Sequence, residues 1–330
     1  PALRRPSEVP RPLTRDSTAL ALYRAGRYLL RQSYQDSDAA TRRKSIEMLR
    51  QAVARDSGFA HAYILLAEAI RESDGLDENG DGSRRLDYIR RAIALDSTIA
   101  EAHSLLAGIL LERNYDVRGA AAEHRKAMSL NPSSVDVLWE FSLFLRVVGR
   151  PGEALKHLRR AKALEPENAF VRGGILQTLR GLEDTTQLRR EIDEAMMLLP
   201  NFVGVRHHLA HLELKRGRPD SALAILDGLP PTLGNLWLYA QAGRPEPARR
   251  RLDSLTALSN NQRLSPITLA VLHSSLDNRR EALDYLWRAH EQGLALAEYL
   301  SDLPFFDSVK SDPRFIELRR RRGLTALGAR

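Results

Sequence analysis

A six-residue pattern, Gly-Arg-Pro-x-x-Ala, occurs three times in this chain, with copies that begin at Gly149, Gly217 and Gly243. The first two copies are separated by two periods of about 34 residues, a spacing typical of helical repeats. A more divergent copy begins at Asp277, one such period after the third. Glycine commonly ends a helix, and proline is tolerated in the first turn of the next one. The spacing therefore predicts a repeating helix–turn–helix unit.

Other signals keep the same period in part of the chain. The sequences at 130–132, 164–166 and 198–200 end in proline and follow one another at this interval. Because proline disfavours helix in its predecessor, each of them should end one helix pair. The related segments that begin at Asp56 and Asp96 are further apart than one period, so we expect an insertion near Asp77. The interval from Gly217 to Gly243 is shorter than one period and includes Pro230-Pro231, which predicts an irregular joint.

From about Ser17 to His290 the chain resembles a tetratricopeptide-repeat protein. Its small packing positions are filled as in that family, by Ala67, Ala107, Ser142 and Ala210 in first helices and by Ala92, Ala127, Ala161 and Ala195 in second helices. The large first-helix position holds Leu66, Leu106, Phe141 and Leu209. The resemblance implies an all-α, right-handed α-solenoid of tetratricopeptide-like helix pairs with a C-terminal capping helix. Leu176 departs from the pattern at a small position.

Three regions are expected. Residues 1–14, with four prolines among charges, predict a linker. Residues 15–298 predict the repeat solenoid, with about seven to eight helix pairs and an irregularity near 228–242. Residues 299–330 predict a capping segment and a basic C-terminal helix, in which Phe305 and Phe315 cover the last helix pair while Asp312 caps a final helix that starts at Pro313.

The two ends of the array carry a finer resemblance. Residues 303–315 and 19–28 are similar to the closing and opening segments of C-terminal repeat modules in large bacterial signalling proteins. Those proteins carry a Ser/Thr kinase, a nucleotide cyclase or a winged-helix domain ahead of the repeats. The resemblance implies a sensory or docking module without activity of its own. A catalytic domain would then lie upstream in a parent protein, since the chain opens with Pro1 and reads as a piece of something longer.

Composition limits the alternatives. The chain has 50 Lys and Arg against 42 Asp and Glu, a net charge of +8. Most basic residues on predicted second helices have acidic neighbours, which favours a solvated outer face. The rival hypotheses are an Arg-rich solenoid that binds nucleic acid and a metal or small-ligand sensor module. No cysteine, phosphate-binding glycine loop or nucleophile motif occurs, so we expect no enzyme. No apolar run is long enough to span a membrane, so we expect a soluble chain that is either cytoplasmic or the extracytoplasmic part of a membrane-tethered bacterial protein.

The predicted binding surface is the stripe of first-helix residues that faces a concave groove. It consists of Tyr23, Arg27, Ile64, Glu68, Arg71, Ser104, Leu111, Trp139, Leu143, Arg146, Gln177, Arg180, His207 and His211. We expect the centre of this binding surface to be Trp139 with Arg71, Arg146 and Arg180, because aromatic and arginine side chains contribute most of the binding energy at such sites. The partner would be a protein or peptide segment with acidic and apolar residues. The alternative for Trp139 is packing against the next repeat.

Two candidate metal sites remain. Asp77, Asn79 and Asp81 are spaced like the first ligands of a calcium loop. Tyr88 stands where the closing bidentate glutamate should be, so a solvated acidic turn without tight calcium binding is preferred. His207 and His211, one helical turn apart, could share a zinc or copper ion, but no third ligand is evident and hydrogen bonding is preferred. No other cofactor is expected, and the oligomeric state is left open.

Overall fold

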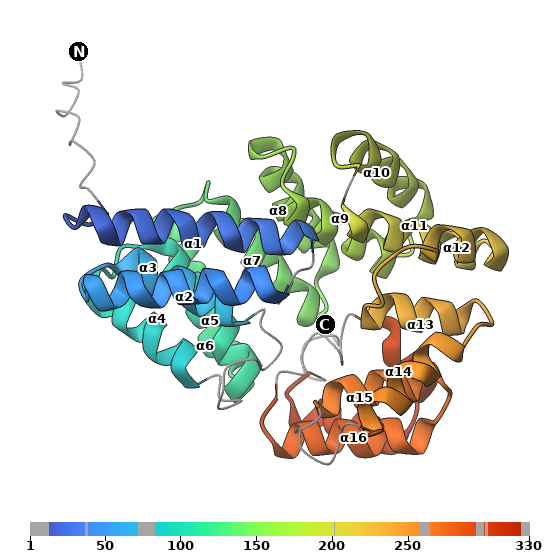
Figure 1. Cartoon of the computed structure of the whole chain (residues 1–330). Helices are drawn as coiled ribbons and strands as arrows, with labels where there is room; N and C mark the ends of the chain where they lie inside the picture. The colour runs from blue at the N-terminus through green and yellow to red at the C-terminus, as the bar shows by residue number, and fades with distance from the viewer. Residues whose placement is uncertain are drawn as a thin grey trace. The chain divides into compact units, whose positions relative to one another are not determined.

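The computed structural model describes residues 13–36, 39–71, 83–200, 202–257, 265–294, 300 and 303–324. Every regular element within these ranges is a helix (Figure 1). The chain forms two compact units, Pro1–Leu105 and Leu106–Arg330. The all-α architecture predicted from the repeats is confirmed.

The helices follow one another along the chain in consecutive pairs. The first unit contains α1 (Ser17–Asp36), α2 (Ala39–Arg55), α3 (Ala60–Arg71), α4 (Ser83–Leu95) and the start of α5 (Ala100–Asn114). The second unit continues with α6 (Val117–Leu130), α7 (Val135–Val147), α8 (Pro151–Leu164), α9 (Ala169–Gly181), α10 (Thr185–Leu198), α11 (Val203–Lys215), α12 (Pro219–Leu226), α13 (Leu233–Gln241), α14 (Glu246–Ala257), α15 (Pro266–Ser275), α16 (Arg279–Glu291), η1 (Pro304–Val309) and α18 (Pro313–Arg321). The short α12 and α13 lie where the shortened interval predicted an irregular joint.

Left-handed residues mark the repeat register in the second unit. The turn between the two helices of a pair contains a residue with positive φ at each of six places: Tyr115 (52°), Gly149 (79°), Glu183 (56°), Gly217 (72°), Gly243 (83°) and Asp277 (58°). The first four follow one another at one constant interval, the repeat period, and the same interval separates the last two. The predicted role of glycine at these helix ends is confirmed, and three non-glycine residues accept the same backbone conformation at a cost in strain.

Small residues allow the two helices of a pair to approach closely. Every small packing position expected from the sequence is buried: Ala67, Ala107, Ser142 and Ala210 in first helices, and Ala92, Ala127, Ala161 and Ala195 in second helices. In the first unit Gly26 has the same function, because a Cβ atom there would lie 2.7 Å from Leu49 Cγ. The Ser45 hydroxyl donates a hydrogen bond to the Gly26 carbonyl oxygen at 2.7 Å and fixes this contact between α1 and α2.

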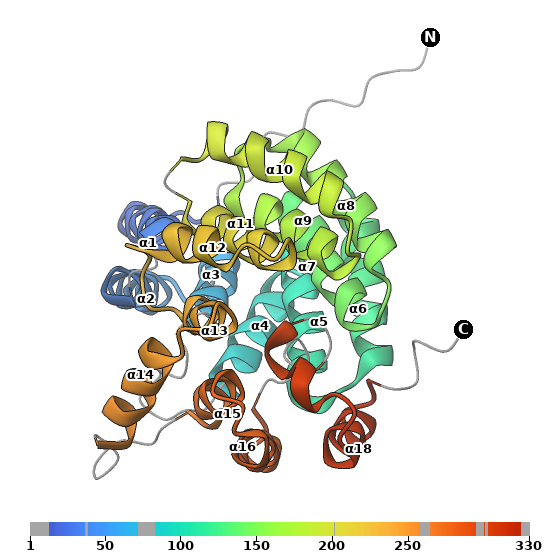
Figure 2. The ribbon, with the colours of Figure 1, turned by 90° about the vertical axis from the view of Figure 1, so that its right-hand side faces the viewer.

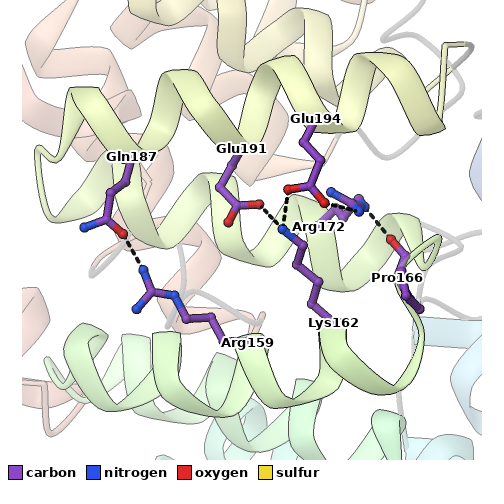
Figure 3. A network of polar contacts seen from close by, with 7 residues as sticks. All are labelled: Arg159, Lys162, Pro166, Arg172, Gln187, Glu191 and Glu194. Carbon is purple, nitrogen blue, oxygen red and sulfur yellow. Dashed lines mark hydrogen bonds and ion pairs between the residues drawn. The ribbon is translucent and has the colours of Figure 1, made fainter.

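A polar network connects α8, the following turn, α9 and α10 on the surface of the second unit (Figure 3). Lys162 of α8 bonds the carboxylates of Glu191 at 2.7 Å and Glu194 at 2.6 Å, both on α10. Arg172 of α9 bonds Glu194 at 3.0 Å and donates from Nε to the carbonyl oxygen of Pro166 at 2.5 Å. Three helices and one turn are therefore tied by charged hydrogen bonds, which are stronger than neutral ones.

The C-terminal residues pack onto the second unit as a structured segment. Phe306, Phe315 and Leu318 are buried in one apolar cluster with residues of α15 and α16, whereas Phe305 is half-buried. Asp312 caps α18 by accepting a hydrogen bond from the Arg314 amide at 2.8 Å. The predicted burial of Phe315 and the predicted cap at Asp312 are confirmed.

Candidate functional site

The first helices α7, α9 and α11 lie toward the centre of the second unit, and their partners α8 and α10 lie outside them (Figure 2). Ser134 caps α7 and Asn168 caps α9 through their side-chain oxygens. Left-handed residues end the turns that follow α7, α9 and α11. The caps start α7 and α9, and the left-handed residues stop all three helices in the same register, so equivalent residues lie side by side.

Basic side chains from these helices gather at one place, which we call the basic wall. It consists of Arg146 on α7, Arg180 on α9, and His207, His208 and His211 on α11. Arg146 and Arg180 occupy the same position in consecutive repeats. The electrostatic influence of Arg180 reaches all three histidines, and that of Arg146 reaches His208. Arg146, His208 and His211 are buried, at 7%, 8% and 7% exposed.

The histidines of the basic wall are neutral at physiological pH. Burial, followed by the charge of Arg180, lowers the pKa of His211 to about 3. Burial also lowers the pKa of His207 to about 4, although its hydrogen bond to Asn235 acts in the opposite direction. Burial and then the charge of Arg180 hold the pKa of His208 well below its usual range. The wall therefore presents guanidinium charge beside neutral imidazoles, which can donate or accept hydrogen bonds.

Each histidine has a distinct environment. His207 Nδ1 lies 3.0 Å from Asn235 Oδ1, and the Asn235 amide donates to the Pro230 carbonyl oxygen at 2.8 Å. The His211 ring stacks on Trp237 of α13, with 6.1 Å between ring centroids and 15° between ring planes. Nδ1 of His208 is buried and has no hydrogen-bond partner among the described residues.

The predicted groove stripe is only partly accessible, which corrects the expectation of an open row of side chains. Six of its members are buried: Tyr23, Ile64, Ser104, Leu111, Arg146 and His211. Arg27 is exposed, and the half-buried members are Glu68, Trp139, Leu143, Gln177, Arg180 and His207. Nothing is described for the side chain of Arg71. Tyr23, for example, packs against Phe59, the residue before α3, with 5.0 Å between ring centroids.

Trp139 belongs to the packing between repeats. Its ring lies edge-on to Phe170, 5.7 Å between centroids, and a Cβ atom on Gly174 would lie 3.7 Å from its Nε1. It borders the apolar cluster formed by α7 to α11. The alternative interpretation, packing against the next repeat, describes Trp139 better than a central hot spot does.

Sequence reasoning missed Trp237 and Asn235 and did not place His208 on the binding surface. The first two lie on α13, within the shortened interval that breaks the repeat period. The spacing therefore gave no register for that helix. His208 lies directly after the stripe residue His207, and helical spacing alone directs it away from the groove.

The metal hypotheses have different outcomes. Asp77, Asn79 and Asp81 lie outside the described residues. Among the residues that the structure describes, no cluster of three His, Asp or Glu side chains could hold a metal ion. His207 and His211 instead contact Asn235 and Trp237.

The basic run at residues 319–322 is largely committed to contacts within the chain. Arg320 and Arg321 both pair with Glu317, at 2.7 and 2.8 Å. Arg322 is only 1% exposed, and its guanidinium carbon lies 3.7 Å from the centroid of the Tyr115 ring. This run is therefore a poor surface for nucleic acid.

Comparisons with known proteins concern the fold. The chain matches no protein-family profile and no curated protein. A monomeric mutant of IFIT1 has a TM-score of 0.54 at 15% identity, over 83% of this chain and 71% of that one. Yeast Tom70 has a TM-score of 0.50 at 17% identity, over 93% and 68%. A TPR protein of Thermus thermophilus has a TM-score of 0.47 at 16% identity, over 58% and 100%.

No described helix is long and apolar enough to span a membrane. The helix pairs, the repeat register and the fold shared with the IFIT1 mutant and Tom70 agree on one architecture. The chain is an all-α solenoid of tetratricopeptide-like helix pairs.

Proposed function

We propose that this chain is a protein-binding scaffold and that the basic wall contacts the partner. The observation that carries the proposal is the convergence of Arg146, Arg180 and three histidines on three successive first helices. Guanidinium groups recognise carboxylates through several hydrogen bonds at once. Leu143, half-buried on α7 about one helical turn from Arg146, adds apolar area. The partner is therefore a segment that combines acidic and apolar residues.

The repeat geometry narrows the partner further. Packed helices are about 8–10 Å apart, so equivalent positions on α7 and α9 are separated by roughly that distance. An extended peptide advances about 3.3 Å per residue. Two acidic residues that are about three apart in the partner would then meet Arg146 and Arg180 together.

We also propose that the scaffold is a repeat module of a bacterial signalling or regulatory protein. The support is the resemblance of residues 303–315 and 19–28 to the ends of such modules. Under this proposal the chain has no activity of its own, and it binds a partner on behalf of a kinase, cyclase or DNA-binding domain. Sequencing the gene upstream of Pro1 tests this role.

The binding proposal is tested with short fluorescein-labelled peptides that carry two glutamates, placed at positions i and i+3, and flanking leucines. Binding is read by fluorescence anisotropy. Arg180→Gln should weaken binding by roughly 30-fold, the loss expected for a hot-spot residue worth about 2 kcal/mol. The matched control is Arg150→Gln, because Arg150 is exposed and pairs only locally with Glu153. Equal affinity of the Arg180 and Arg150 variants, or no binding by any of these peptides, would contradict the proposal.

Nucleic-acid binding by the first unit is a second candidate. Arg24, Arg27, Tyr28 and Arg31 are all exposed along α1, and they combine phosphate-binding charge with an aromatic face. The IFIT1 mutant structure with a similar fold contains Gppp-AAAA, a property of that protein. Binding of a single-stranded oligonucleotide should then weaken steeply with salt and be lost in the Arg24→Gln/Arg31→Gln variant. An unchanged oligonucleotide affinity in this variant would rule out nucleic-acid binding through α1.

A further inference from the structure

The segment Pro304–Val309 rests on α13 and α15 of the second unit. The Phe305 ring lies edge-on to Trp237, with 5.8 Å between centroids. The Ser274 hydroxyl donates a hydrogen bond to the Phe305 carbonyl oxygen at 2.5 Å. Phe306 is fully buried beside them. A short extended-to-3₁₀ segment thus contacts repeat helices through two aromatic rings and one backbone group, as a bound peptide would.

The far end of the C-terminal segment contacts the turn between α5 and α6. Arg322 follows α18, and its guanidinium lies on the Tyr115 ring at 3.7 Å. The Tyr115 hydroxyl donates a hydrogen bond to the Leu294 carbonyl oxygen at 3.1 Å. The C-terminal segment is therefore held at two places, at Trp237 through Phe305 and at Tyr115 through Arg322.

Tyr115 occupies a position that favours glycine. Its φ is 52°, and the equivalent residues one and three repeats later are Gly149 and Gly217. A bulky residue in the left-handed region is strained, and such strain persists where the side chain serves a purpose. In this chain the Tyr115 ring contacts Arg322, and its hydroxyl binds the backbone just before the C-terminal segment.

The contact made by Arg322 is a costly one. The side chain is almost completely buried, yet Nε and Nη1 have no hydrogen-bond partner among the described residues. Nη2 donates one long hydrogen bond, 3.3 Å, to the His290 carbonyl oxygen. Desolvation lowers the pKa of Arg322 to about 10. Burying a guanidinium with so few hydrogen bonds costs free energy, and this cost offsets much of the stabilisation from its cation–π contact. The contact is therefore easily released.

We infer that the surface of α13 and α15 around Trp237 and Ser274 is a docking surface for a short Pro-Phe-Phe-type segment, and that the chain's own Pro304–Val309 occupies it. The Tyr115–Arg322 contact keeps the segment in place. When that contact opens, a partner with a similar aromatic segment takes the surface. The inference does not depend on the basic wall, since it concerns a different surface and a different ligand chemistry. The competing interpretation is that residues 303–324 are a permanent part of the core.

The test uses the full chain and a labelled synthetic peptide that copies residues 303–324. In the wild type the surface is occupied, and the peptide should bind at least tenfold more weakly than to the Tyr115→Gly variant. Tyr115→Gly removes the ring and relaxes the turn, so it should fold. Glu183→Gly is the matched control, because it makes the same backbone change at an equivalent turn whose side chain is exposed. Arg322→Ala is a second way to release the segment, because it removes both the cation–π contact and the packing of the side chain.

Hydrogen exchange provides the second readout. Amides of residues 304–309 should exchange at least tenfold faster in Tyr115→Gly and Arg322→Ala than in Glu183→Gly, while α15 and α16 keep their protection. A peptide with Phe305 replaced by alanine should bind at least tenfold more weakly than the copy. Unchanged exchange in both releasing variants, or equal binding of the altered peptide, would overturn the inference.

Discussion

Arg172 and Glu194 form an ion pair in which the arginine is 1% exposed and the carboxylate remains partly open to solvent, with 3.0 Å between Nη2 and Oε1. Because Arg172 also bonds the Pro166 carbonyl oxygen, one side chain joins α9, α10 and the turn before α9. The side chain is buried, and its Nε and Nη2 atoms bond into the network in Figure 3, whereas Nη1 has no hydrogen-bond partner among the described residues. This residue should matter more for stability than the exposed arginines do.

We expect Arg172→Met to lower the free energy of unfolding by about 2–4 kcal/mol, since hydrogen bonds to charged groups contribute about 1.5–3 kcal/mol each and are not additive. Arg189→Met is the control, because Arg189 makes an exposed i,i+4 pair with Asp193 that is worth about 0.5 kcal/mol or less. Urea denaturation of the two variants measures the difference. Equal losses would show that the Arg172 network contributes no more than a surface pair.

Substitutions at Gly149 and Gly152 separate the effect of backbone strain on stability from the effect of steric fit. A Cβ atom at either position would meet no atom within 4 Å, but only Gly149 has a left-handed backbone. Gly149→Ala should therefore destabilise the chain by about 1–2 kcal/mol. Gly152→Ala, in the first turn of α8, should be neutral or stabilise by up to about 1 kcal/mol. Thermal denaturation gives both signs, and destabilisation of the same size by both changes would refute the role of the turn.

The sequence predicted the fold well because its signals are local and periodic. The repeat period locates residues whose function depends on a single turn or a single helix pair. These are the glycines at 149, 217 and 243, which end helices, and the alanines at 92, 127, 161 and 195, which lie where two helices touch. The binding stripe could not be predicted as well. Whether Arg146 or His211 is accessible depends on how neighbouring repeats pack, which the spacing within one helix does not specify.

The contact between Tyr115 and Arg322 illustrates the same limit. The two residues lie far apart in the chain, and no repeat period relates them. The basic run at 319–322 indicates a charged helix surface, whereas the structure buries one of its four arginines. Predicting a long-range contact of this kind requires knowledge of how the whole second unit folds.

His124 should make stability sensitive to acid. It packs between Phe141 and Phe144, with 5.3 and 5.1 Å between ring centroids, and burial lowers its pKa to about 3. The unfolded chain, with a histidine pKa near 6.5, binds the proton more readily than the folded chain does. The free energy of unfolding is therefore highest above about pH 6.5 and decreases as the pH falls toward 3. At pH 5 the loss is about 2 kcal/mol.

His124→Phe should reduce this pH dependence, because the ring packing is kept and the titrating group is removed. Urea denaturation at pH 7.5 and pH 5 gives the loss for each protein, and the variant should lose about 2 kcal/mol less than the wild type. His61→Phe is a useful comparison, because the pKa of His61 is lowered chiefly by burial but is raised by the nearby Glu101 and Asp96. An identical pH dependence for wild type and His124→Phe would contradict the buried neutral state.

The most direct test of the binding proposal is to measure amide hydrogen exchange of the full chain with and without a saturating concentration of the acidic–apolar peptide. The basic wall predicts slower exchange in α7, α9 and α11, with the second half of each helix affected most, because Arg146, Arg180 and His211 lie there. The same peptide should leave α1 and residues 303–324 unchanged. Protection confined to α1 or to the C-terminal segment, with α7, α9 and α11 unaffected, would contradict the proposed function.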